Sequence, residues 1–173
     1  MRVALVRHAT PMVKPGVCYG RLDVVLAPNC EDQLAAMRAR LLGFAAEVLW
    51  SSPAVRCRRT AIALECGLQM IVDDRLLEMD FGEWEGRAWD DVPRDLLDRW
   101  AADPAGFAAP GGESGNKLLA RVTSFCRDIQ ASGRDCVIVS HGGPLKLLRA
   151  MLAGNTVDFF AAPPAIGSVT MFN

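Results

Sequence analysis

Short apolar runs alternate along this chain with segments whose apolar residues recur every three or four positions. The runs predict β-strands over residues 2–6, 47–50, 70–72, 136–139 and 169–172, the last as an edge strand. The three-to-four spacing predicts helices over residues 34–45, 90–101, 118–129 and 144–152. A further helix is expected to begin with Ser52 as its N-cap and Pro53 as its first residue. This alternation favours an α/β three-layer sandwich, with a mostly parallel central sheet and helices on both faces.

Two long segments interrupt this alternation. Residues 9–29 carry three prolines and two glycines and show no helical or strand period, and residues 75–115 are rich in glycine, proline and tryptophan. An irregular loop of this length in a compact domain is usually functional. We therefore expect both segments to contribute to a binding site.

Composition narrows the class of protein without naming a function. The 173 residues, 51% of them hydrophobic and 23% charged, suit one globular domain over residues 1–173. With 19 basic and 20 acidic residues there is no general positive field for nucleic acid or an anionic membrane, so any anion site must be local. No apolar stretch approaches the length of a membrane span and the first residues do not form a signal peptide, so we expect a cytoplasmic protein.

The six cysteines show neither a Cys-x-x-Cys pair nor a spacing that suggests zinc ligation. A domain of this size has enough apolar residues to fold without a disulfide framework. We interpret all six as free thiols and expect no metal site.

The chain has two histidines, and both follow predicted strands. His8 ends the first apolar run, directly after Arg7, and His141 ends the fourth. Because ligands bind at the carboxyl ends of parallel strands, adjacent strands would bring the two imidazoles together there. Gly142, Gly143 and Pro144 follow His141 at the start of a predicted helix, whose free N–H groups and dipole favour phosphate. The pattern points to phosphoryl transfer through a histidine.

Such a reaction needs cations around the phosphorus and a proton for the leaving oxygen. Arginines with forked donors are the expected partners of the phosphoryl group, and Arg56 joins Arg7 as a candidate. The neighbouring Arg58 and Arg59 are interpreted as a solvated helix face. For the acid, Glu78 is the most suggestive residue. Charge alone does not choose among four carboxylates of one segment, which are Glu78, Asp80, Glu83 and Glu85.

Five motifs in this order resemble those of the histidine phosphatase superfamily, in the branch that contains cofactor-independent small phosphatases and phosphoglycerate mutases. They are Arg-His at 7–8, Ser-Ser-Pro-x-x-Arg at 51–56, Glu-x-x-Phe-Gly-x-Trp-Glu-Gly at 78–86, Gly-Gly-Glu-Ser at 111–114 and Ser-His-Gly-Gly at 140–143. The resemblance covers nearly the whole chain.

This resemblance implies a role for each matching residue. His8 would be the nucleophile that becomes phosphohistidine, Arg7, Arg56 and His141 would hold the phosphoryl oxygens, and Glu78 would donate the proton. It implies no metal and no other cofactor. One departure stands out, because the family usually has glycine where this chain has Ala9. An alanine there would lower activity if the backbone required a positive φ.

Within the superfamily, residues 16–23 and the short chain are most similar to the α-ribazole phosphatases. That similarity implies a small-molecule phosphate ester as partner, either α-ribazole 5′-phosphate or its adenosylcobalamin counterpart, in cobalamin biosynthesis. Candidate substrate-binding residues beyond the phosphate site are Tyr19, Arg21, Trp84 and Gly142. Tyr19, Phe81, Trp84 and Trp89 are candidates for stacking on a flat base; Phe81 and Trp84 would otherwise pack beneath the site, which is the interpretation we favour for Phe81.

Other functions stay open from the sequence. A broad-specificity phosphatase would carry a related loop. A phosphoglycerate mutase is less favoured because this chain lacks the longer insertions and tail of the mutases. A protein that binds phosphorylated ligands without turnover is supported by Ala9 alone. The sequence leaves the oligomeric state undetermined, with a homodimer as one option.

Overall fold

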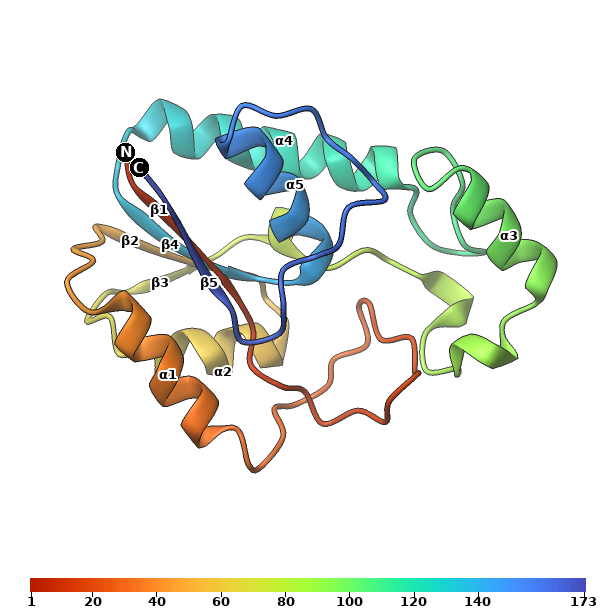
Figure 1. Ribbon diagram of the computed structural model, residues 1–173, viewed down its shortest axis with the longest axis horizontal. Helices are drawn as coiled ribbons and strands as arrows, with labels where there is room; N and C mark the ends of the chain where they lie inside the picture. Colours follow the sequence, from red (N-terminus) through yellow and green to blue (C-terminus); the bar gives the residue numbers. More distant parts are fainter.

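One mixed sheet of five strands forms the centre of the protein in a computed structural model that describes residues 1–173 (Figure 1). The strands are β1 (Val3–Arg7), β2 (Val48–Ser51), β3 (Met70–Val72), β4 (Cys136–Ser140) and β5 (Val169–Phe172), in the spatial order β3-β2-β4-β1-β5. The first four are parallel to one another, and β5 pairs antiparallel with β1 at the edge of the sheet. All five strands lie within a residue or two of their predicted positions.

Helices cover both faces of the sheet. Two of them, α1 (Glu31–Leu41) and α2 (Val55–Ala63), pack on one face, whereas α4 (Gly115–Ser132) and α5 (Gly142–Leu152) pack together on the other (Figure 1). The remaining helix, α3 (Arg94–Ala102), lies beyond the carboxyl ends of the parallel strands with two 3₁₀ turns, η2 (Gly82–Trp84) and η3 (Trp89–Asp91); a third turn, η1 (Asp74–Leu76), packs against α4. The predicted three-layer α/β sandwich is confirmed.

The central strands are buried on both faces, as their unbroken apolar sequences predict. In β1, Val3 and Leu5 join the core under α4 and α5, while Ala4 and Val6 join the core under α1 and α2. Each fully buried branched side chain contributes about 1.5–3 kcal/mol to folding. A third, smaller cluster around Trp84 lies within the irregular segments. The two large cores fix the strand ends on which the site is built.

The predicted start of the second helix is wrong. Helix α2 begins at Val55, and Ala54 precedes it with φ −55° and ψ 136°, outside the helical region. The Ser52 hydroxyl contacts the His141 ring and does not cap the helix. Arg56 nevertheless lies in the first turn, as predicted.

Two other helices differ from their predicted bounds. The predicted helix over residues 90–101 is divided into η3 and α3, because Pro93 cannot continue a helix and stands at the N-cap of α3. Helix α5 begins at Gly142, two residues earlier than predicted, so its N-terminus reaches the end of β4.

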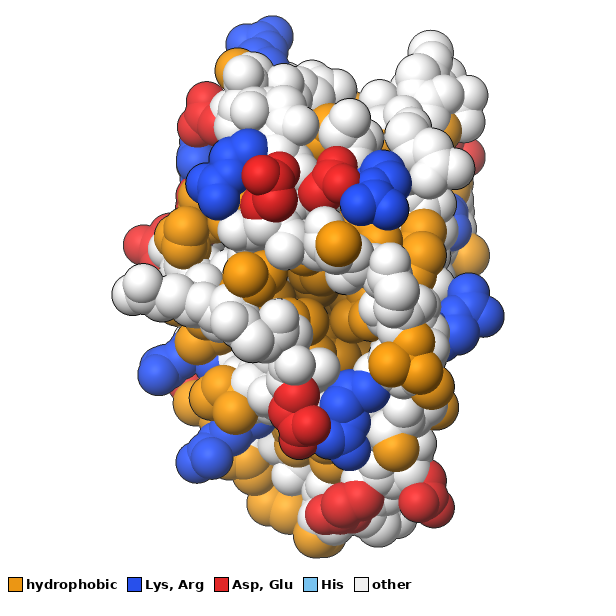
Figure 2. Space-filling model, turned by 90° about the vertical axis from the view of Figure 1, so that its left-hand side faces the viewer, with side chains coloured by type: hydrophobic (Ala, Val, Ile, Leu, Met, Phe, Trp, Pro, Cys, Tyr) orange, Lys and Arg blue, Asp and Glu red, His pale blue; other side chains and the backbone are white.

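Figure 2 looks onto the end of the molecule where the two termini lie. Charged side chains of both signs surround an apolar recess there. No large patch of one charge lies on this face, in keeping with the formal net charge of −1. None of the helices combines the length and the apolar character that a membrane-spanning helix needs. All six cysteines are free thiols, as predicted.

Candidate active site

The two histidines meet at the carboxyl ends of β1 and β4. Arg7 pairs with Ser140 in the parallel register, so His8 and His141 leave the sheet side by side. Their ring centroids lie 5.2 Å apart in an edge-to-face arrangement, and neither residue is more than 1% exposed. The juxtaposition predicted from the sequence is confirmed.

His8 is held in one orientation with one nitrogen available. Its Nδ1 lies 2.8 Å from the carbonyl oxygen of Ala9, so Nδ1–H donates and the lone pair belongs to Nε2. The pKa of His8 is lowered to about 3, chiefly by burial and also by the charges of Arg56 and Arg7, against the opposing effect of the Ala9 hydrogen bond. At neutral pH His8 is therefore an uncharged imidazole, the form required of a nucleophile.

His141 is also kept neutral. Its Nε2 lies 2.8 Å from the Ser52 hydroxyl oxygen and 3.4 Å from the Cys57 sulfur. Burial holds the pKa of His141 well below its usual range, with the Arg56 charge as the next cause. The Ser52 hydroxyl also accepts from the amide of Ala54 (3.4 Å), so it links the His141 ring to the turn that precedes α2.

Two arginines reach this pair of rings without a carboxylate partner. Arg56 is fully buried and donates to the carbonyl oxygens of Gly20 (2.7 Å) and Leu22 (2.9 Å), while Arg7 donates to the Pro164 carbonyl (2.6 Å). In both guanidinium groups Nε is buried and has no hydrogen-bond partner. Buried cations with free donors are costly unless an anion completes them. The arrangement therefore favours an oxyanion ligand such as phosphate.

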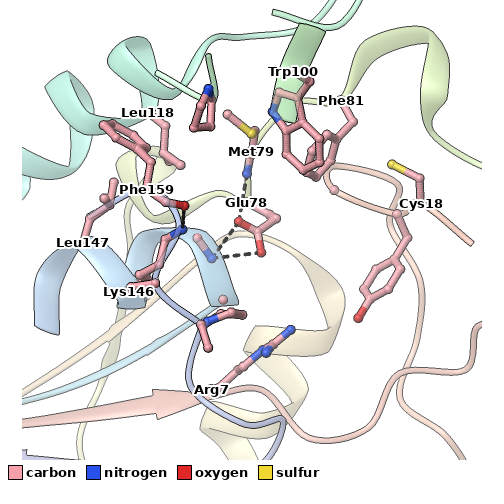
Figure 3. A pocket seen from close by; sticks show the side chains of 18 of the residues that line it. Arg7, Cys18, Glu78, Met79, Phe81, Trp100, Leu118, Lys146, Leu147 and Phe159 are labelled. Carbon is pink, nitrogen blue, oxygen red and sulfur yellow. Dashed lines mark hydrogen bonds between the residues drawn. The ribbon is translucent and has the colours of Figure 1, made fainter. Parts of the chain in front are cut away.

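Among the four candidate acids, Glu78 is the one that lines the cavity at this site (Figure 3). Its carboxylate accepts hydrogen bonds from the amides of Met79 (3.0 Å) and Gly143 (3.1 Å), at the first turn of α5. A Cβ at position 143 would lie 2.4 Å from Glu78 Oε1. Gly143 thus makes room for the carboxylate, and Figure 3 shows this carboxylate facing the cavity above Arg7.

The other three carboxylates have different surroundings. Asp80 accepts from the amide of Gly82 (2.9 Å), and Glu83 is exposed. Glu85 accepts from three backbone amides, those of Arg21, Leu22 and Phe81. It therefore holds the loop whose carbonyls receive Arg56. Of the four carboxylates, only that of Glu78 lines the cavity.

A cavity of about 560 Å³ opens from the phosphate end of the site. Its polar lining includes Arg7, His8, Glu78 and Lys146. Most of the remaining lining is apolar and aromatic, and comes from the two irregular segments and from the segment after α5; it includes Tyr19, Phe81, Trp89, Trp100, Phe159 and Phe160. The cavity thus combines an anion site at one end with an apolar compartment beside it.

Three aromatic residues form one wall, which we call the aromatic wall: Phe81, Trp89 and Trp100. Trp89 and Trp100 stack with centroids 5.9 Å apart and planes 5° apart, and Phe81 packs edge-on against both. Trp84 lies behind them, 1% exposed, and does not line the cavity. The candidate assignment of Trp84 to substrate contact is therefore wrong. Phe81 packs against two of the hydrophobic core clusters, as the favoured interpretation expects, and it also lines the cavity.

Of the three remaining candidates, two line the cavity and one does not. Arg21 points to the Glu113 and Asp80 carboxylates, at 3.4 and 4.0 Å, and does not line the cavity. Tyr19 lines the cavity and has the Arg56 guanidinium 5.4 Å from its ring centroid. Gly142 also lines it, with Arg7 Cζ 3.1 Å from where a Cβ would be.

Sequence reasoning missed Trp100 and Lys146. Lys146 lies four residues after Gly142, so helical spacing alone would have placed it on the same face of α5. It is half-buried, burial lowers the pKa of its ammonium group, and Nζ donates to the Phe159 carbonyl (2.6 Å) (Figure 3). Trp100 gave no comparable signal, because its place depends on how the segment after Pro93 folds back.

Ala9 fits the site without strain. Its φ is not positive, its side chain is fully buried, and its amide donates to the Thr60 hydroxyl (3.0 Å). The positive φ that would have made alanine harmful here is absent. Ala9 therefore gives no structural support to a protein without turnover.

Comparison with known proteins places these features in context. The sequence model of the histidine phosphatase superfamily (branch 1) matches residues 3–172. Phosphoserine phosphatase 1 of Hydrogenobacter thermophilus is 31% identical over 169 residues, which cover 92% of this chain and 80% of that protein. An Escherichia coli protein named probable phosphoglycerate mutase is 33% identical over 166 residues, covering 89% and 75%.

Two solved structures illustrate the structural likeness. A mycobacterial glucosyl-3-phosphoglycerate phosphatase in complex with VO₃ has a TM-score of 0.84 and 28% identity, covering 98% of this chain and 91% of that one. The α-ribazole phosphatase from Shigella flexneri has a TM-score of 0.89 and 24% identity, covering 99% and 89%. The second likeness speaks for a shared fold only.

Proposed function

From the premise that this chain belongs to the histidine phosphatase superfamily, we propose that it hydrolyses a small-molecule phosphate monoester through a phosphohistidine at His8. One observation carries the proposal. An uncharged imidazole with a free Nε2 lies beside two arginines, the half-buried Arg7 and the fully buried Arg56, whose buried Nε donors have no partner. A bound phosphate would neutralise both cations and present phosphorus to the nucleophile.

In the first proposed step, His8 Nε2 attacks phosphorus and the bond from phosphorus to the ester oxygen breaks. Glu78 transfers its proton to that oxygen, so the alcohol leaves uncharged. Arg7, Arg56 and His141 hold the phosphoryl oxygens as negative charge moves onto them. These residues supply the charge stabilisation, so the proposed reaction uses no metal.

In the second step, Glu78, now a carboxylate, takes a proton from water as the water oxygen attacks phosphorus. The bond from phosphorus to His8 Nε2 breaks, inorganic phosphate leaves, and the ring returns to its neutral form. Glu78 recovers its proton and can act again. The proposal takes residues 1–173 as a single catalytic domain.

We propose α-ribazole 5′-phosphate as the preferred substrate, with its adenosylcobalamin counterpart as a larger alternative. The aromatic wall supports this choice, because a flat base stacks well on indole and phenyl rings. The apolar lining of the cavity supports it too, since it offers few groups for a strongly charged alcohol.

A phosphorylated carboxylic acid, such as phosphoserine or 3-phosphoglycerate, is the second candidate. Lys146 favours it, because this half-buried ammonium group lines the cavity and has no carboxylate partner. The named relatives of similar sequence include a phosphoserine phosphatase and a protein named probable phosphoglycerate mutase. A mutase would interconvert phosphoglycerates faster than it releases phosphate.

The experiment is phosphate release from a panel of esters, with H8A as the blank. The panel contains α-ribazole 5′-phosphate, O-phosphoserine, 3-phosphoglycerate, nucleoside monophosphates and p-nitrophenyl phosphate. We expect the highest kcat/KM with α-ribazole 5′-phosphate. Preference for phosphoserine or 3-phosphoglycerate would replace that substrate with the second candidate. Equal, slow release across the panel would indicate a broad-specificity phosphatase, and no release would contradict the proposed activity.

A pair of tryptophan variants links the preference to the cavity. Trp100→Leu removes part of the aromatic wall and should lower kcat/KM for α-ribazole 5′-phosphate about 10-fold, leaving phosphoserine little changed. Trp50→Leu is the matched control, because Trp50 lies on β2 and packs against Phe125, outside the cavity lining. An equal loss on both substrates in W100L would argue against stacking.

A further inference from the structure

Arg121, on α4, holds the stretch of backbone that carries Glu78. Its Nη1 donates to the carbonyl oxygens of Arg75 (2.8 Å) and Leu77 (2.6 Å), and its Nη2 donates to that of Glu78 (3.0 Å). One guanidinium group thus gathers three carbonyls from four consecutive residues. It lies behind the backbone of Glu78 and is not part of the cavity lining.

The other donors of Arg121 go to Glu113. Nε and Nη2 donate to the two oxygens of this carboxylate, with Nε at 3.2 Å from Oε2. The side chains are 16% and 11% exposed, so the pair is largely shielded from water. The Arg121 guanidinium holds the pKa of Glu113 below its usual range despite the burial of that carboxyl group. All five N–H donors of Arg121 are used, which fixes its plane.

Glu113 also holds the backbone just after Glu78. Its Oε1 accepts from the amide of Asp80 at 3.1 Å. The ion pair of Arg121 and Glu113 therefore forms hydrogen bonds to the backbone on both sides of Glu78, from position 75 to position 80. After Leu76, where η1 ends, the backbone up to Asp80 belongs to no helix or strand.

We propose that Arg121, locked by Glu113, is a positioning residue for the proton donor Glu78. The inference rests on the proposed function, in which Glu78 must place a proton on the leaving oxygen. Two amides direct the Glu78 carboxylate from the front, and Arg121 holds its backbone from behind. A displacement of about 1 Å in a catalytic group can cost about 100-fold in rate.

The test compares leaving groups in the variant Arg121→Met. A p-nitrophenolate leaves without protonation, whereas an alkoxide needs the proton from Glu78. We expect kcat/KM for the best alkyl phosphate of the panel to fall about 100-fold. That for p-nitrophenyl phosphate should fall much less. A role in stability alone would lower both values equally, because it changes only the amount of folded enzyme.

Arg75→Met is the matched control. Arg75 belongs to the same interface with α4, pairs with Asp73 and Asp128, and lies over the Phe125 ring. Its side chain makes no bond to the Glu78 backbone. R75M should lose thermal stability while keeping the wild-type ratio of alkyl to aryl kcat/KM. A wild-type ratio in R121M would overturn the inference.

A third variant separates this inference from the proposed function. Glu78→Gln must show the leaving-group dependence if Glu78 is the acid. If E78Q lacks it, the proposed mechanism fails. If E78Q shows it and R121M does not, only the positioning role fails. Should R121M not fold, Arg121→Lys keeps the charge beside Glu113, cannot reach all three carbonyls, and is judged by the same ratio.

Discussion

Two imidazoles that stay uncharged inside a positively charged site define this protein at the residue scale. His8 and His141 are buried beside Arg7 and Arg56, and both burial and charge repulsion oppose their protonation. A protonated His8 could not attack phosphorus, so the surroundings that lower its pKa also keep it reactive. Binding of phosphate, on this account, relieves the repulsion among the cations.

This arrangement predicts that stability falls in mild acid. The folded protein keeps both histidines neutral, with the pKa of His8 at about 3, whereas the unfolded chain protonates them near pH 6.5. The unfolded state therefore binds more protons, and the free energy of unfolding should decrease as pH falls below about 6.5. Each histidine contributes a slope of up to about 1.4 kcal/mol per pH unit.

Urea denaturation between about pH 7.5 and about pH 5 measures that slope. The variant His8→Gln has one titrating ring fewer and should lose about half of it. Equal stability across this range would mean that the histidines ionise alike in the folded and unfolded states.

At the residue scale, the sequence predicted which side chains lie together wherever a short motif marked them. His8, His141 and Arg7 follow from strand ends, and Arg56 from its place after Ser-Ser-Pro. The choice of Glu78 over Glu85 was not predictable from charge, because both belong to one acidic segment. It depends on which carboxylate faces the α5 N-terminus and which turns to the backbone of residues 21, 22 and 81.

At the scale of elements, the first turn of α5 positions groups of the proposed active site. The helix begins at Gly142, immediately after His141, and its second residue offers an amide to the Glu78 carboxylate. Negative charge is favoured at a helix N-terminus, so this end suits both Glu78 and a phosphate. Because Gly143 has no side chain, the Glu78 carboxylate can approach this amide.

Gly143→Ala tests this role. The φ at position 143 is not positive and alanine favours helices, so the variant should fold with a melting temperature at or above that of the wild type. The added methyl would displace the Glu78 carboxylate, and we expect kcat/KM for alkyl phosphates to fall about 100-fold. Unchanged activity on alkyl phosphates would show that the position of this carboxylate does not matter.

Most helices and strands were predictable from the sequence, and the start of α2 shows why one of them was misplaced. All five strands are short apolar runs, of which β1, β2 and β4 are mostly buried, and hydrophobic patterning detects such runs well. The start of α2 was misplaced because Ser52 and Pro53 form a good capping signal in isolation. In the structure the Ser52 hydroxyl contacts both His141 and the amide of Ala54, ahead of the helix, and a local sequence pattern does not reveal the contact with His141.

At the scale of the whole molecule, a sheet with two cores supports a cavity built from irregular segments. The strand ends place the phosphate site, while residues 17–20, 78–104 and 159–163 supply most of the cavity's other lining. The sequence predicted the first part through motifs, identified residues 17–20 and 78–104 only as parts of long irregular segments, and gave no signal for residues 159–163. Which tryptophans face the cavity depends on how η2, η3 and α3 fold. The sequence therefore suggested Trp84 as a substrate contact and did not suggest Trp100, which lines the cavity.

The most direct test of the whole account is to look for phosphate on His8. The protein is mixed with p-nitrophenyl phosphate, quenched in base because phosphohistidine is labile to acid, and the modified peptide is identified by mass spectrometry. We predict phosphate on His8 in the wild type, more of it in E78Q because water is no longer activated, and none in H8A. Phosphate on His141, or turnover without any labelled histidine, would contradict the account.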